Sequence, residues 1–198
     1  MNARKLAAAA LVLSLVLPPA GSRAESRRAL AMQQPKIVVK LIPFGSKRMR
    51  QTRAYAKRHY GLDTWQLRDP EVIVELHTGS NTFEPAHRLF ASNTKHLGEY
   101  PGSCAHFVID KNGMIYEVVN TEIICRHTIG LNWTAIGVEN VGTSDLQITH
   151  NSRHMNASLR LTVWLMQEYG ISIGNGNGIG HAGSLRSRSY RERVAAYR

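Results

Sequence analysis

Short runs of β-branched and other apolar residues predict several strands. Residues 37–42 and 72–76 are apolar runs bounded by polar, proline or glycine positions, which is typical of strands. Residues 105–109 and 114–119 flank the tetrapeptide DKNG, and an Asn-Gly turn between two apolar runs predicts a β-hairpin. A further strand is expected over residues 135–141, an apolar run interrupted by one glutamate.

Helical periodicity predicts the remaining elements. A basic helix is expected to begin at Ser46, with this serine as its cap, and to end near residue 57, with Gly61 as the stop signal. Residues 156–169 carry apolar side chains at helical spacing, and residues 185–197 are also expected to be helical. Both helices follow strand-like stretches along the chain.

Strands and helices interleave, with one tight hairpin among longer connections such as the turn-rich residues 78–103. This order is typical of an α/β domain in which helices flank a central mixed β-sheet. No repeat, low-complexity tract or linker divides residues 44–198. We therefore expect one domain there, preceded by an arm and first strand over residues 25–43.

The first 24 residues have the pattern of a secretory signal peptide. Arg4 and Lys5 precede the apolar run 6–17, and small residues lead to a cleavage position after Ala24. A transmembrane anchor would need about 20 consecutive apolar residues, and two prolines stop this run earlier. No cysteine directly follows the run, so a lipid anchor has no attachment residue. We expect an exported protein, periplasmic or secreted, without a stable membrane anchor.

The charge and the cysteine content leave several kinds of binding partner open. The formal net charge is +11, and it falls by three, to +8, if Arg4, Lys5 and Arg23 leave with the signal peptide. In an exported protein, a basic surface is either simply solvated or contacts lipid headgroups, wall polymers or peptidoglycan carboxylates. The composition alone does not distinguish these possibilities. Export argues against nucleic acid as a partner. An oxidising compartment permits a bridge between Cys104 and Cys125, but the sequence does not decide whether they pair.

Two histidines and one glutamate occupy positions that suit a catalytic site. His77 and His181 each directly follow a short strand-like run, VIVEL and GIG, so we expect them at the edge of one sheet. Glu139 lies inside the apolar run AIGVENVG, and burial would raise its pKa toward the range useful to a general base. Taken singly, each residue is explained as well by a hydrogen-bonded histidine or a paired core glutamate.

The other histidines are weaker candidates. His150 and His154 have the four-residue spacing of a metal-binding pair, but loop-forming residues between them favour a surface pair. His59, His87 and His96 have polar neighbours, which predicts solvated side chains. The sequence contains no HExxH or paired-cysteine metal motif.

Five blocks of sequence, in order, resemble the zinc-dependent N-acetylmuramoyl-L-alanine amidases, which share their fold with phage amidase-type lysozymes and peptidoglycan recognition proteins. The blocks fall within about residues 44–194 and read VIVELHTGS, CAHFVIDKNGMIYEVV, RHTIGLNWTAIGVENVG, YGI and GIGHAGSLRSRSYRERV. The resemblance implies an α/β fold of the peptidoglycan-recognition/amidase type. It also implies hydrolysis of the amide between N-acetylmuramic acid and L-alanine, with peptidoglycan or muropeptides as partners.

The resemblance also assigns roles to individual residues. It implies that His77 and His181 bind Zn²⁺ and that Glu139 activates water. His127 and Asn132 match positions that line the substrate cleft. A catalytic zinc takes three protein ligands and leaves a fourth position for water, so this set is one ligand short.

The third ligand is the point where this chain departs from the family. The family supplies an aspartate in a Thr-His-x-Asp-like segment, which we expect after Arg198, beyond the last residue of this sequence. Asp145 and His150 are the substitutes within the sequence. His106 matches a family histidine to which we assign a structural role. The alternative function is therefore a non-catalytic peptidoglycan-binding module of the same fold, and the sequence does not indicate an oligomeric state.

Overall fold

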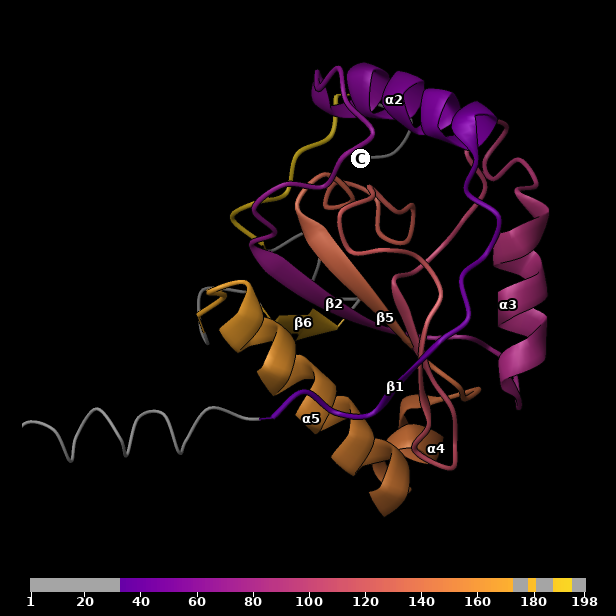
Figure 1. Ribbon diagram of the computed structural model, residues 1–198, viewed down its shortest axis with the longest axis vertical. Helices are drawn as coiled ribbons and strands as arrows, with labels where there is room; N and C mark the ends of the chain where they lie inside the picture. Colours follow the sequence, from indigo (N-terminus) through magenta and orange to yellow (C-terminus); the bar gives the residue numbers. More distant parts are fainter. Residues whose placement is uncertain (1–32, 173–177, 181–186, 194–198) are drawn as a thin grey trace, which may run out of the picture. The chain divides into compact units, whose positions relative to one another are not determined.

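The computed structural model describes residues 33–172, 178–180 and 187–193, in which helices surround a mixed β-sheet (Figure 1). The strands are arranged in the order β1-β4-β3-β5-β2-β6. Their bounds are β1 Ile37–Val39, β2 Val72–His77, β3 Phe107–Ile109, β4 Ile115–Glu117, β5 Ala135–Asn140 and β6 Gly178–Gly180. Strands β3 and β4 pair antiparallel, and the other pairs are parallel. The predicted mixed sheet and hairpin are confirmed.

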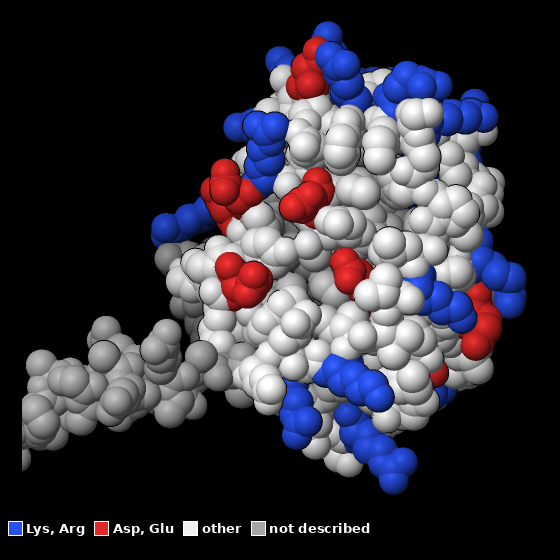
Figure 2. All heavy atoms as spheres, in the orientation of Figure 1, with Lys and Arg blue, Asp and Glu red and all other residues white. Residues whose placement is uncertain are grey.

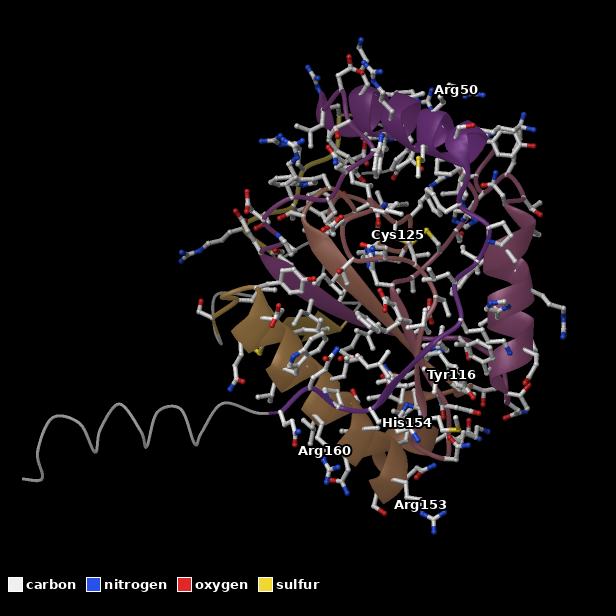
Figure 3. The ribbon with its side chains drawn as sticks, in the orientation of Figure 1. Arg50, Tyr116, Cys125, Arg153, His154 and Arg160 are labelled. Atoms are coloured by element: carbon white, nitrogen blue, oxygen red, sulfur yellow. A yellow bond between two sulfur atoms is a disulfide. The ribbon has the colours of Figure 1, made fainter. Side chains whose placement is uncertain are left out.

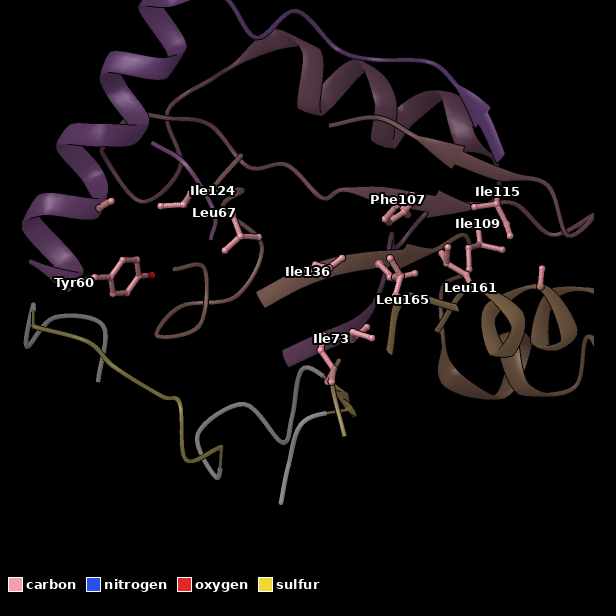
Figure 4. Close-up of a cluster of buried hydrophobic side chains, with 14 of the residues drawn as sticks. Tyr60, Leu67, Ile73, Phe107, Ile109, Ile115, Ile124, Ile136, Leu161 and Leu165 are labelled. Carbon is pink, nitrogen blue, oxygen red and sulfur yellow. The ribbon is translucent and has the colours of Figure 1, made fainter. Parts of the chain in front are cut away.

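Helices cover both faces of this sheet. Their bounds are α2 Ser46–Tyr60, α3 Phe83–Ser92, α4 Asp145–Thr149 and α5 Ser152–Glu168. Successive side chains of a strand point to opposite faces, and β3 follows this rule. Phe107 belongs to a core cluster with Leu161 and Leu165 of α5 (Figure 4), whereas Val108 belongs to a second cluster with Phe90 of α3. Burial of each of these leucines contributes roughly 1.5–3 kcal/mol.

Helix α2 carries basic side chains on its exposed surface, which Figure 2 shows as a group of blue residues at the top of the view. Gly45, in an extended conformation, occupies the N-cap position, so the prediction that Ser46 caps the helix is wrong. Gly61 ends the helix in the left-handed conformation, as predicted, and its N–H donates to the carbonyls of Ala56 and Lys57.

Helix α5 begins four residues earlier than predicted. Asn151 caps it by accepting a hydrogen bond from the backbone N–H of His154. His154 is therefore in the first helical turn and is fully buried, with its Nε2 2.8 Å from Asn140 Oδ1 (Figure 3). The prediction of a surface pair is wrong for His154, although His150 is exposed at the end of α4.

The segment Ser187–Arg193 is held by long-range contacts. It is not helical, so the helix predicted there is wrong, and the rest of that prediction lies outside the described residues. The Arg191 N–H donates to the Gly130 carbonyl at 2.8 Å, and the Arg193 N–H donates to the His59 carbonyl at 2.9 Å. These bonds tie the segment to the loop before β5 and to the end of α2.

His59 of α2 is buried between two carboxylates. Its Nδ1 lies 2.8 Å from Glu192 Oε1, and its Nε2 lies 2.7 Å from Glu99 Oε1. Arg58 and Arg126 also pair with Glu99. We call these five residues the His59 cluster. The prediction that His59 is solvated is wrong, because partners distant in sequence enclose it.

Cys104 and Cys125 form a disulfide, with their Cα atoms 5.4 Å apart (Figure 3). The bridge joins the residues before β3 to the segment that leads into the loop before β5. The backbone N–H of Arg126 also donates to Cys104 Sγ at 3.2 Å.

Within the described residues, the helices are too short or too polar to cross a lipid bilayer.

Candidate active site

The carboxyl ends of β2 and β5 bring two of the predicted site residues close together. The strands are parallel neighbours, with Leu76 in register with Glu139 and His77 in register with Asn140. His77 and Glu139 therefore lie on neighbouring strands and are displaced by one residue along the strand direction. His77, the last residue of β2, has an exposed side chain. The prediction that His77 ends this strand is confirmed.

A cleft of about 880 Å³ opens over these strand ends. His77 and Glu139 line it from the sheet, and His127 lines it from the loop before β5. Helix α3 supplies an apolar wall and α4 closes another side. The lining also includes Leu89 and Phe90 of α3, Asn132, Asn140 and Asp145. The cleft thus combines an apolar wall with imidazole and carboxylate groups, which is typical of a binding or catalytic site.

Glu139 is the most perturbed acidic group in this cleft. Its Oε2 atom is buried and has no hydrogen-bond partner among the residues that the structure describes. Burial, and to a lesser extent the negative charge of Glu75, together raise the pKa of Glu139 to about 7. The carboxyl is therefore balanced between its two protonation states near neutral pH, as a general base requires.

Glu75 is a site residue that the sequence reasoning missed. It lies two residues before His77, is partly buried, and contacts Thr162 of α5. Thr162 Oγ1 donates to its Oε1 at 2.7 Å, and Asn140 Nδ2 donates to its Oε2 at 2.7 Å. Burial raises the pKa of Glu75, and these hydrogen bonds partly oppose the rise. A glutamate in the otherwise apolar run VIVEL was the available signal, of the same kind that marked Glu139.

His127 packs directly on the backbone of β5. A Cβ atom at Gly137 would lie 2.6 Å from the His127 ring, so only glycine leaves room for it. His127 Nε2 donates to the Ala135 carbonyl at 3.2 Å, and its Nδ1 lies 3.0 Å from Thr128 Oγ1. Gly137 and Glu139 are two residues apart on one strand and so face the same side. His127 and Glu139 are therefore neighbours on one face of β5.

Asn132 lines the base of the cleft, as expected from the sequence, and its side chain is completely buried. Its Oδ1 accepts from the backbone N–H groups of His127, at 2.9 Å, and Thr128, at 2.7 Å. Its Nδ2 donates to the hydroxyls of Tyr55, at 3.0 Å, and Tyr60, at 3.3 Å. Both the oxygen and the nitrogen of the Asn132 amide therefore have hydrogen-bond partners within the protein.

His106 is also enclosed by protein groups. Its Nε2 donates to the Ile123 carbonyl at 2.9 Å, and its Nδ1 accepts from the Gly137 N–H at 2.9 Å. Burial lowers the pKa of His106 to about 4, so the ring is neutral. It bridges Gly137 of β5 and Ile123, which follows β4 in the chain. This placement agrees with the structural role expected from the sequence.

The described residues fit a metal site in part. His77 presents an imidazole to the cleft, and the buried Glu139 Oε2 lacks a partner that a bound water would supply. His181, the second predicted ligand, lies outside the described residues. No group of three metal-binding side chains occurs in residues 33–172, 178–180 and 187–193. Of the two expected substitutes, Asp145 lines the cleft, and His150 bonds instead through Nδ1 to the Leu146 carbonyl at 2.8 Å.

The sequence profile of the N-acetylmuramoyl-L-alanine amidase family (Amidase_2) matches residues 66–192. The chain belongs to this amidase family. The matched range contains every site residue predicted from the sequence: His77, His127, Asn132, Glu139 and His181. A search of curated proteins found no significant match.

Solved structures show the amidase fold. The endolysin N-acetylmuramoyl-L-alanine amidase LysCS from Clostridium intestinale URNW is 22% identical, with a TM-score of 0.55 over 76% of this chain and 84% of that chain. Drosophila peptidoglycan recognition protein SA is 18% identical, with a TM-score of 0.52 over 75% of this chain and 81% of that chain. The Ph2119 endolysin from Thermus scotoductus MAT2119 bacteriophage Ph2119 is 17% identical, with a TM-score of 0.50 over 74% of this chain and 86% of that chain. The predicted fold of the peptidoglycan-recognition/amidase type is confirmed.

Proposed function

We propose that this amidase-family chain is a zinc-dependent N-acetylmuramoyl-L-alanine amidase. Its substrate is the amide between the lactyl group of N-acetylmuramic acid and the L-alanine of a peptidoglycan stem peptide. Glu139 carries this proposal, because its pKa of about 7 and its buried, unpartnered Oε2 among the described residues suit a base that accepts a proton from water.

His77 and His181 are the proposed zinc ligands, and Asp145 is the proposed third. A bound zinc ion would lower the pKa of its water and polarise the scissile carbonyl. The remaining tasks belong to the chain itself. Glu139 takes the proton of the attacking water, His127 contacts the substrate from the same face of β5, and the apolar wall of α3 excludes solvent.

The decisive assay is release of stem peptides from purified peptidoglycan, with wild-type protein stripped of metal and then supplied with Zn²⁺. We expect activity only after zinc is added. His77→Ala should abolish it, and should weaken zinc binding by more than the ~10–100-fold that outer-sphere changes cost. Asp145→Asn should also weaken zinc binding, whereas the matched control His150→Ala, five residues away and outside the cleft, should not.

Equal activity of His77→Ala and wild type would contradict the zinc assignment. Equal zinc affinity of Asp145→Asn and wild type would remove Asp145 from the ligand set and leave the other assignments standing.

A peptidoglycan-binding module without catalysis is the second candidate. It is suggested by the similarity of the fold to Drosophila peptidoglycan recognition protein SA. If the wild-type protein with zinc releases no stem peptide yet sediments with peptidoglycan, this second function replaces the first.

We also propose that the protein is exported, with residues 1–24 as its signal peptide. The disulfide between Cys104 and Cys125 supports this, because such bridges persist in oxidising compartments. Expressed in a Gram-negative host, the mature protein should be recovered from the periplasm, and N-terminal sequencing should begin at Glu25. Recovery of a product that retains Met1 in the inner membrane would show that the segment is not cleaved.

A further inference from the structure

The loop before β5 is organised by one side chain. The Oδ1 atom of Asn132 accepts the N–H groups of two consecutive residues, His127 and Thr128. Two donors on one oxygen fix the backbone at the point where the imidazole of His127 leaves the chain. The ring then packs over Gly137, on the backbone of β5.

Helix α2 fixes the other end of the same amide. Tyr55 and Tyr60 place their hydroxyls 3.1 Å apart, and the Nδ2 of Asn132 donates to both. Because the nitrogen must face these oxygens, the oxygen of the amide must face His127. All three polar side chains are buried. A buried polar network whose members all have partners is rigid, since breaking any bond leaves an unsatisfied group.

We propose that Asn132, held by Tyr55 and Tyr60, is a positioning residue that sets His127 beside Glu139 in the cleft. Helix α2 thereby contributes to substrate binding without touching the substrate. This inference rests on the proposed function, in which His127 contacts the substrate. It differs from the role that the family resemblance gave Asn132, because the amide of Asn132 is fully used by protein groups.

The test compares Asn132→Ala with wild type in the stem-peptide release assay. We expect KM to rise roughly tenfold or more while kcat stays within about twofold, because a misplaced binding group weakens substrate binding without removing the base. A variant that was merely less stable would lower the active fraction, and with it the apparent kcat, without raising KM. The double variant Tyr55→Phe/Tyr60→Phe, which removes the two hydroxyls that hold Nδ2 but leaves the Asn132 side chain present, should also raise KM, by less than Asn132→Ala.

Thr52→Val is the matched control. Thr52 lies on the same helix, is fully buried, and its hydroxyl has no hydrogen-bond partner among the described residues. Removing this hydroxyl should leave KM unchanged. A rise in KM similar to that of Asn132→Ala would mean that any change in α2 disturbs the cleft, which would overturn the specific role of Asn132.

Amide hydrogen exchange measured by NMR gives a readout that does not depend on activity. The amide protons of His127 and Thr128 should be protected in wild type and in Thr52→Val, and should exchange rapidly in Asn132→Ala. Protection that persists in Asn132→Ala would overturn the proposal, as would lost protection with an unchanged KM. If wild type has no amidase activity, the proposed function fails, while the exchange data still decide whether Asn132 holds the loop.

Discussion

Glu139→Gln should reduce kcat for stem-peptide release by roughly 10²–10⁴-fold, the usual contribution of a general base. The substitution keeps the shape of the side chain and removes its ability to accept a proton. Glu117→Gln is the matched control, because Glu117 is a partly buried glutamate on β4, outside the cleft, whose pKa burial also raises. It should leave kcat unchanged. Comparable activity of Glu139→Gln and wild type would exclude Glu139 as the base.

The same substitution should stabilise the metal-free protein at alkaline pH. Glu139 has a pKa of about 7 in the folded protein, against 4.5 for an unperturbed glutamate, so the folded state holds the proton more tightly than the unfolded state. The wild-type free energy of unfolding therefore falls as the pH rises from about 4.5 to 7, by up to about 3 kcal/mol. Glu139→Gln lacks this loss. Urea unfolding with a chelator at pH 5 and pH 8 should show the two proteins diverging only at the higher pH.

His59→Ala should lower the free energy of unfolding by about 3–5 kcal/mol, because it leaves the carboxylates of Glu99 and Glu192 facing each other without the ring between them. Urea unfolding monitored by circular dichroism measures this loss. Arg53→Ala is the control: Arg53 pairs with Asp63 at 2.7 Å, but both side chains are about half exposed. Such a surface pair contributes less than about 1 kcal/mol. Similar losses of unfolding free energy in the two variants would show that burial does not strengthen the contribution of the His59 cluster to stability.

Features set by neighbouring residues were predictable from the sequence. The Asn-Gly turn specifies the β3–β4 hairpin, and the run before His77 specifies a strand that ends at this histidine. Glu139 could be singled out as a site residue because burying a charged side chain in an apolar strand costs free energy unless the charge has a partner or a function. The order of the sequence blocks then identified the fold.

Features set by distant residues were not predictable in this way. His59 has polar neighbours in sequence, but its two partners lie 40 and 133 residues away. The segment Ser187–Arg193 was expected to be helical, yet the N–H groups of Arg191 and Arg193 bond to the distant carbonyls of Gly130 and His59. Asn132 was assigned to the substrate cleft by resemblance, and only the structure shows that Tyr55 and Tyr60 occupy its amide.

The His59 cluster also sets an order of events during synthesis. A ribosome makes the chain from its N-terminus, so Glu192 emerges 133 residues after the histidine that it contacts. Strand β6, which pairs with β2, is similarly late. Until these residues appear, β2 lacks its neighbour β6 and His59 lacks its contact with Glu192. The segment Ser187–Arg193 can therefore make its contact with α2 only after the ribosome has added the 133 residues that separate His59 from Glu192. Chaperones that bind unfolded chains have that interval in which to act.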